Sequence, residues 1–339
     1  MTTKILFYLS LFVFVCSIQA QQSDFATIDF TKADSLAKAY KNEQLTNIPE
    51  LTKKLTSGLT TDVEKFRAVY KWICTNIAND YGLYEQNMHK RNKFKNDSSK
   101  LKQWNRKFSA ISFKKLSKHQ RAICTGYAYL LQQFSLEIGI PCNIVHGYAR
   151  TSTTFIDKDS SPNHSWNAVW LNNQWYLCDP TWASGVPDPK TGTFSFYYNN
   201  GFFMAEPQLM AINHFPVDTQ WLLLKENPPT FTNFLEAPIL YGNTFEYLSN
   251  YNTPAKMHYE IEKNDSIVYQ FTLKKQVNSK DIRLFIDGGN GPKEVTPEHI
   301  SIHNNTVTLT HSFNKKSFYD VHLYIEDHII STHTIKVHK

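Results

Sequence analysis

Two stretches near the middle of the chain, "HSWNAVWL" (164–171) and "QWYLCDPTW" (174–182), constrain the fold more than any other feature of the sequence. Both read as strands, and only Asn172-Asn173 separates them, which is a strong signal for a β-hairpin. The run "CNIVHGYAR" (142–150) precedes them and reads as a further strand. Three successive strands of this kind predict an antiparallel meander.

A helix with a cysteine in its first turn precedes the meander. Its apolar residues recur every three or four positions, as a buried helical stripe does: Tyr127, Leu130/Leu131, Phe134 and Ile138. Gly139 and Pro141 predict its end. A helix followed by an antiparallel meander favours the α+β class of fold.

Residues 31–79 also show helical periodicity. Thr61 and Glu64 form a Thr-x-x-Glu capping box at the start of one helix. Cys74 lies beside the apolar stripe of that helix, and we interpret it as a core thiol.

The segment 89–121 interrupts the pattern. It holds 12 lysines and arginines and a single acid, Asp97, a formal charge of +11 on a chain whose net charge is +6. A run of like charge indicates a solvated loop or an irregular insertion. The alternative is a functional one, in which the segment creates a positive field beside the helix that starts at Cys124.

The two ends of the chain carry different signals. Lys4, the apolar run 5–16 and "SIQA" ending at Ala20 are typical of a secretory signal peptide, because the run is shorter than the about 20 residues that span a bilayer. A membrane anchor is the alternative. From about residue 235 onward, short alternating runs separated by Gly, Asn and Pro predict a β-sandwich.

The position of Cys124 indicates chemistry rather than packing. A helix N-terminus presents unpaired N–H groups and a partial positive charge, which stabilise a thiolate and an oxyanion. A nucleophile needs a base, and the base needs an orienting group. His164 opens one predicted hairpin strand and Asp179 follows the other, so both fall at the same end of the sheet. Cysteine spacing of the zinc-binding type is absent from the sequence, so we predict no metal and no cofactor.

These motifs resemble the transglutaminase-like superfamily, which has a papain-like fold. The matching elements are Cys124–Ala128, Gly139–Cys142, Gly147-Tyr148, His164–Asn167 and Trp175–Trp182. The resemblance covers about residues 45–235, and its nearest group is that of bacterial exported members and kyphoscoliosis-peptidase-like proteins. It implies Cys124 as nucleophile, His164 as general base and acid, and Asp179 as the residue that orients His164.

The resemblance leaves the oxyanion-stabilising side chain open. Tyr81 and Trp104 are candidates for that role, or are core aromatics. Trp166 and Trp182 flank the catalytic positions and either wall a substrate pocket or only pack. Cys142 and Cys178 lie on neighbouring strands, where a disulfide and two buried thiols are the alternatives.

The sequence therefore predicts an exported α+β protein, with a papain-like transglutaminase-like core and an all-β immunoglobulin-like sandwich. We expect a secreted or periplasmic cysteine hydrolase or acyltransferase that acts on a protein, peptide or cell-envelope polymer, acidic ones included. We expect neither nucleic-acid binding nor stable membrane insertion after signal cleavage. A cross-linking transglutaminase and a non-catalytic peptide- or glycan-binding module are the alternatives. The expected parts are a leader (1–20), a catalytic domain (21–230) with its basic insertion (89–121), and the sandwich (235–339).

Overall fold

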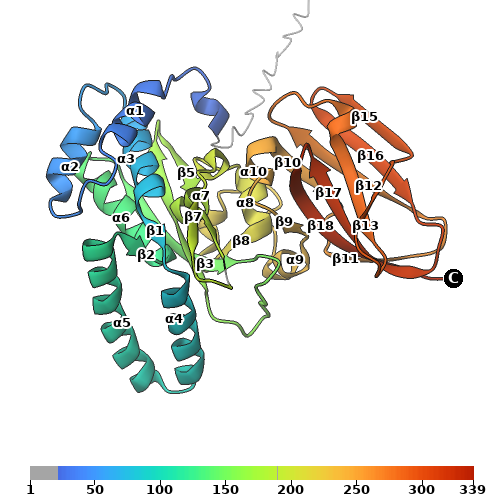
Figure 1. Ribbon diagram of the computed structural model, residues 1–339, viewed down its shortest axis with the longest axis horizontal. Coiled ribbons are helices and arrows are strands. Elements are labelled where there is room, and N and C mark those ends of the chain that lie inside the picture. The colour runs from blue at the N-terminus through green and yellow to red at the C-terminus, as the bar shows by residue number, and fades with distance from the viewer. Residues whose placement is uncertain (1–21, 189) are drawn as a thin grey trace, which may run out of the picture.

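The computed structural model describes residues 22–188 and 190–339 (Figure 1). The predicted leader, residues 1–20, lies outside this part of the chain, together with Cys16 and the expected new N-terminus at Gln21. Among the described residues, no helix is long and apolar enough to cross a membrane.

Helices dominate the first half of the described chain and strands dominate the second (Figure 1). The α-helices are α1 (Thr31–Ala39), α2 (Ile48–Leu55), α3 (Asp62–Asn76), α4 (Tyr81–Phe94), α5 (Ser98–His119), α6 (Cys124–Glu137), α7 (Pro180–Ser184), α8 (Pro207–Asn213), α9 (Phe231–Glu236) and α10 (Thr244–Tyr247). Short 3-10 helices are η1 (Gln22–Phe25), η2 (Asn200–Phe202), η3 (Thr219–Leu222) and η4 (Ser279–Asp281). The strands of the first half are β1 (Ala78–Asn79), β2 (Arg121–Ala122), β3 (Cys142–Ala149), β4 (His164–Leu171), β5 (Gln174–Cys178), β6 (Gly185–Pro187), β7 (Phe194–Phe196) and β8 (His214–Pro216).

The predicted meander is confirmed. Strands β5, β4, β3 and β8 form one antiparallel sheet in that order. Asn172 and Asn173 have φ values of 46° and 61°, so both turn residues occupy the left-handed region that a tight hairpin turn requires. The hairpin register places His164 at the start of β4 and Asp179 just past the end of β5, at the same end of the sheet.

Helices α3 and α6 pack against each other and α6 packs on this sheet, so that their apolar stripes join one core. The capping box at the start of α3 is present, with Thr61 and Glu64 each bonding the other's backbone. Asn167 on β4 donates a hydrogen bond to the carbonyl of Ala128 on α6, at 3.0 Å. That bond ties the strand that carries His164 to the helix that carries Cys124.

Close packing around β3 requires a glycine at position 147. A Cβ atom there would lie 2.3 Å from the carbonyl oxygen of Phe215 and 2.6 Å from the ring of Trp166. Only glycine therefore lets β8 pair with β3 while the Trp166 ring lies against the sheet.

The prediction of a loop or irregular insertion for the basic segment 89–121 is wrong. The chain leaves at β1 and returns at β2, which pair in parallel, and between them α4 and α5 form a helical hairpin that projects from the rest of the molecule (Figure 1). Asp80 caps α4 and makes ion pairs with Lys115 (3.2 Å) and Arg121 (3.5 Å) at the base of the hairpin. A small apolar cluster holds the two helices together: Leu83, Trp104, Phe108 and Ile123.

The C-terminal part is a sandwich of two sheets, as predicted. Its strands are β9 (Ile239–Leu240), β10 (Leu248–Thr253), β11 (His258–Ile261), β12 (Ser266–Leu273), β13 (Ile282–Asp287), β14 (Lys293–Val295), β15 (His299–His303), β16 (Thr306–Ser312), β17 (Ser317–Ile325) and β18 (His328–Val337). One sheet has the order β10-β12-β16-β15. The other has the order β11-β18-β17-β13-β14, and β9 also pairs with β18.

Strand β9 also connects the sandwich to the helical half. Asn213 at the end of α8 donates a hydrogen bond to the carbonyl of Leu240, at 2.8 Å. Lys274, just after β12, makes an ion pair with Glu206 at 3.5 Å, and both side chains are largely buried. The two halves are therefore joined by specific polar contacts as well as by the chain.

Candidate active site

Cys124 is the first residue of α6, as the sequence predicts. Ile123 precedes it as the N-cap residue and offers no side-chain cap, so this helix end has no side-chain acceptor for its first N–H groups. Gly126 allows β2 to pass close by, because a Cβ atom there would lie 2.8 Å from the Cβ of Ala122. Cys124 is 7% exposed, and it lines a groove on the surface.

His164 and Asp179 form a buried hydrogen-bonded pair. The Nε2 atom of His164 lies 2.7 Å from Oδ2 of Asp179. The other carboxylate oxygen accepts hydrogen bonds from the backbone N–H groups of Thr181 (2.8 Å) and Trp182 (3.1 Å), at the start of α7. These bonds fix the carboxylate, which in turn fixes the orientation of the imidazole.

The environment of this pair favours a charged carboxylate and a charged imidazole. Burial raises the pKa of Asp179, but its interactions with His164 and His214 outweigh burial and bring that pKa well below its usual range. Burial lowers the pKa of His164, whereas Asp179 and then Cys124 raise it, with a net pKa of about 10. His164 therefore interacts with both Asp179 and Cys124, and its Nδ1 is the ring nitrogen that remains for the cysteine.

His214, which was not predicted from the sequence, belongs to the same site. Its Nε2 atom lies 3.1 Å from the same Oδ2 atom of Asp179, and its side chain is fully buried. Burial lowers its pKa to about 4, so the ring is neutral at physiological pH. "HFP" at 214–216 carries no local signal for this contact, because His214 reaches Asp179 only through the pairing of β8 with β3.

His164, Asp179 and His214 also form a group whose donor atoms could hold a metal ion. Neighbouring ligand atoms of a tetrahedral zinc site lie about 3.3 Å apart, given bonds of about 2.0–2.1 Å. The separations here are 2.7 Å and 3.1 Å, as in hydrogen bonds to a carboxylate. The geometry fits an imidazole–carboxylate–imidazole arrangement better than a metal centre.

Two tryptophans enclose the imidazole of His164. The ring of Trp166 stacks on it at 6.0 Å between centroids, and the ring of Trp182 lies 5.6 Å away at a tilt. Trp182 also contacts His214 at 4.4 Å. These rings keep water from the hydrogen bonds to Asp179.

The groove has a volume of about 940 Å³. Its walls come from α4, the loop 151–163, the start of α7, β6 and the segment 239–242. Of the predicted pocket residues, Tyr81 and Trp182 line it.

The prediction that Trp104 and Trp166 belong to the pocket is corrected by the structure. Trp104 is buried in the apolar cluster of the α4–α5 hairpin, where its indole N–H donates to Asn87 at 3.0 Å, so it does not line the groove. The side chain of Trp166 is 1% exposed and its ring stacks on that of His164, so its observed role is packing.

Tyr84 is a second residue that the sequence analysis missed. It lines the groove with Cys124 and packs against the cluster that contains Ile123. Burial raises the pKa of Tyr84 to about 12, and the negative charge of Cys124 contributes to that rise. Tyr84 and Cys124 therefore interact electrostatically across the groove that both of them line. The signal was its spacing of three from Tyr81, which places both on one face of α4.

The three other described cysteines are buried and free. Burial raises the pKa of Cys142 to about 12 and the pKa values of Cys74 and Cys178 well above their usual range. The interpretation of Cys74 as a core thiol is confirmed, and Cys142 and Cys178 follow the alternative of two buried thiols.

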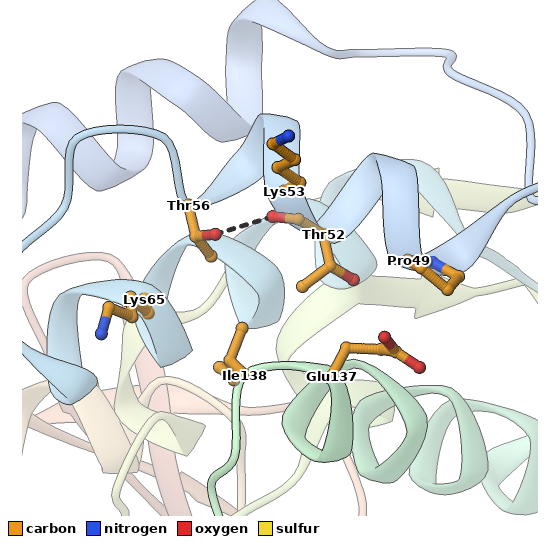
Figure 2. A pocket seen from close by; sticks show the side chains of 7 residues that line it. All are labelled: Pro49, Thr52, Lys53, Thr56, Lys65, Glu137 and Ile138. Atoms are coloured by element: carbon orange, nitrogen blue, oxygen red, sulfur yellow. Dashed lines mark hydrogen bonds between the residues drawn. The ribbon is translucent and has the colours of Figure 1, made fainter.

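A second depression, of about 330 Å³, lies between α2, the start of α3 and the end of α6 (Figure 2). Its polar side chains come mainly from α2: Thr52, Lys53 and Thr56. The predicted site residues are absent from its lining, so the groove at Cys124 is the candidate active site.

A cysteine at a helix start, facing an imidazole–carboxylate pair on an antiparallel sheet, is the arrangement of a papain-like fold. Residues 49–180 match the family model of the transglutaminase-like superfamily, so this part of the chain is a transglutaminase-like domain.

Relatives with similar sequences occur in animals. Kyphoscoliosis peptidase of Homo sapiens is 32% identical over 187 residues, which are 54% of this chain and 25% of that protein. Hillarin of Drosophila melanogaster is 24% identical over 235 residues, 65% of this chain and 26% of that protein. Lim and transglutaminase domain protein ltd-1 of Caenorhabditis elegans is 24% identical over 267 residues, 75% of this chain and 32% of that protein. The chain thus spans about a quarter to a third of the length of these relatives.

Proposed function

We propose that the protein is a cysteine peptidase or amidase that acts by acyl transfer through a thioester on Cys124. One observation carries the proposal: Cys124 starts α6 and lines a groove together with His164, whose Nε2 lies 2.7 Å from Asp179. The human relative is named kyphoscoliosis peptidase, and a peptidase belongs to this reaction class.

In the acylation step, the proton of the Cys124 thiol already resides on His164, and the thiolate sulfur attacks the substrate carbonyl. The S–C bond forms as the carbonyl π electrons move to oxygen. The N–H groups at the start of α6 and the hydroxyl of Tyr84 stabilise that oxyanion. The C–N bond then breaks, and His164 gives its proton to the leaving amine. Its raised pKa favours the protonated imidazole that this transfer needs.

In the deacylation step, water enters the site and His164 takes one of its protons. The hydroxide oxygen bonds to the carbonyl carbon of the thioester, the C–S bond breaks as the carbonyl re-forms, and the free acid leaves while the Cys124 thiolate and the protonated His164 are restored. An amine in place of water would give a cross-link. We favour water because the sequence has no recognisable calcium-site apparatus of the animal cross-linking enzymes.

Thiol labelling tests the assignment without a known substrate. Iodoacetamide at about pH 6 is expected to label Cys124, because a thiolate paired with a cation reacts there while buried structural thiols do not. Cys124→Ala is expected to abolish labelling, and the matched control Cys142→Ala to retain it. An unreactive Cys124 in the folded wild type would contradict the proposal.

Turnover variants test the roles once a substrate is found. Cys124→Ala and His164→Ala are expected to lower kcat/KM by about a thousandfold or more with folding intact. Asp179→Asn leaves a wrongly oriented imidazole and a smaller residual rate. Release of free acid in preference to incorporation of an added amine distinguishes hydrolysis from cross-linking.

We also propose that the protein is exported after removal of residues 1–20, and that its substrate is a protein, a peptide or a cell-envelope polymer. The apolar run 5–16 after Lys4 and the small residue Ala20 support export.

A further inference from the structure

The α4–α5 hairpin carries a set of exposed cations that the proposed chemistry does not use. Helix α5 contains no Asp or Glu, and its exposed cations are Lys100, Lys102, Arg106, Lys107, Lys114, Lys118. Apart from Lys100, which pairs with Asp97, none of these forms an ion pair with a described residue. Lys107, Lys114 and Lys118, spaced by seven and four, share one side of the helix, while Lys102 and Arg106 lie on another.

The hairpin is also a wall of the groove. The residues of its first helix that line the groove recur at helical spacing and include Tyr81, Tyr84, Met88 and Asn92. Leu83 on another face packs with Trp104 and Phe108 of α5. A ligand held by the cations of α5 is therefore held next to the groove.

The groove itself has the opposite charge. Its charged carboxylates are Glu85, Asp157 and Asp159, and Lys95 is its single lysine. An acidic segment would be repelled from this lining and attracted to α5. The acidic lining of the groove and the cations of α5 thus favour different parts of one ligand. A part without negative charge enters the groove, and an acidic part binds the hairpin.

We infer that the α4–α5 hairpin is an exosite that binds an acidic segment of a polypeptide substrate while another part of that substrate occupies the groove. The inference rests on the proposed function for the nature of the substrate, because an amide-cleaving site takes polypeptides. The attraction is long-ranged and raises the association rate, so it acts on kcat/KM more than on kcat.

A membrane surface fits the hairpin less well. An interfacial helix needs an apolar face beside its cations. Leu83, Trp104 and Phe108 are buried in the contact between α4 and α5, which leaves Phe113 as the single large apolar side chain that is strongly exposed on the described hairpin. Single-stranded nucleic acid binds through exposed aromatic rings on which bases stack. Trp104 and Phe108 are each only 8% exposed, and Phe113 of α5, at 64%, offers a single exposed ring rather than a row on which successive bases could stack.

Binding can be measured without catalysis. The protein is the full mature chain with Cys124→Ala, and the probe is a short fluorescent poly-L-glutamate. The test variant replaces Lys102, Lys107, Lys114 and Lys118 with Gln, and the matched control replaces the exposed Lys38, Lys41, Lys225 and Lys280. We expect binding at low salt that is lost near 1 M, where the screening length is about 3 Å. The test variant is expected to bind about tenfold or more weakly, and the control variant as the parent does.

Equal binding by the two lysine variants, or binding that does not depend on salt, would overturn the exosite. So would preferential binding of duplex DNA or of anionic vesicles over poly-L-glutamate. The exosite and the proposed function can fail separately. Poly-L-glutamate binding without any thiol chemistry at Cys124 refutes only the function. A wild-type kcat/KM for an acidic substrate that is insensitive to salt refutes only the exosite.

Discussion

His164 and His214 meet at the same atom, Oδ2 of Asp179, at 2.7 and 3.1 Å. An ionised carboxylate only accepts hydrogen bonds, so both rings present Nε2–H to it. This assignment leaves Nδ1 of His164 for Cys124. His214 does not itself line the groove, although its ring packs against Trp182, which does; its role is to position the carboxylate.

Replacing His214 separates positioning from packing. His214→Leu leaves Asp179 with one donor fewer, which costs about 1.5–3 kcal/mol for a charged acceptor and lowers kcat about tenfold to a hundredfold. His214→Gln retains a donor and is expected to stay within a few-fold of wild type. The hydrogen bond from His214 lowers the pKa of Asp179, so the acid limb of the kcat/KM profile should move to higher pH in the Leu variant. An unmoved acid limb with wild-type rates would assign His214 to packing alone.

Tyr84→Phe tests the proposed oxyanion donor. Loss of one such donor costs about a hundredfold in kcat, with KM nearly unchanged. The matched control is Tyr81→Phe, whose ring lies 6.1 Å from that of Tyr84 and which lines the same groove. If the Tyr81 variant lost activity and the Tyr84 variant did not, Tyr81 would be the donor.

Buried histidines set the pH dependence of stability. Burial lowers the pKa values of His214 and His333 to about 4, from an ordinary value of 6.5. Between pH 6.5 and 4 these histidines bind protons in the unfolded chain but not in the folded chain. The free energy of unfolding therefore falls as the pH falls. His164 acts in the opposite direction, because its raised pKa makes its contribution disappear as the pH rises from 6.5 through about 10. Stability should therefore be greatest near pH 6.5.

Denaturant midpoints across this pH range check the prediction. His333→Gln is expected to flatten the acid side, while replacement of the exposed His303 leaves it unchanged. A midpoint that stays constant from pH 6.5 to pH 4 would show that these histidines are not buried in the neutral form.

The expected removal of residues 1–20 can be examined directly. Mass spectrometry of the protein from outside the cytoplasm should give a chain that begins at or near Gln21. Extracellular material that still carries residues 1–20 would indicate an anchor.

Local signals predicted the elements that build the site. Asn172-Asn173 defined the hairpin, and the hairpin placed His164 and Asp179 at one end of the sheet. The stripe on α6 and Gly139 defined the helix of Cys124. Each of these is a relation between residues near one another in the sequence, where spacing and turn chemistry determine geometry.

The missed features depend on distant contacts. His214 lies 35 residues from Asp179, and nothing within "HFP" indicates that its ring reaches the carboxylate. The α4–α5 helical hairpin was not predicted because its apolar residues are sparse among many lysines. Each of its two helices buries those residues only against the other helix. Asp80, outside the basic segment, pairs with both Lys115 and Arg121, a relation that charge counting does not reveal.

Through strand β9 the sandwich contributes residues to the groove at Cys124. Ile239 and Leu240 pair with Thr332 and Ser331 on β18, and the same two residues line the groove of Cys124. A chain cut near the predicted boundary would lose that wall and leave the buried amide of Asn213 without its carbonyl partner, Leu240. An expression fragment that ends after the catalytic residues would thus carry the triad without its complete groove, and full-length protein is the proper material for a substrate screen.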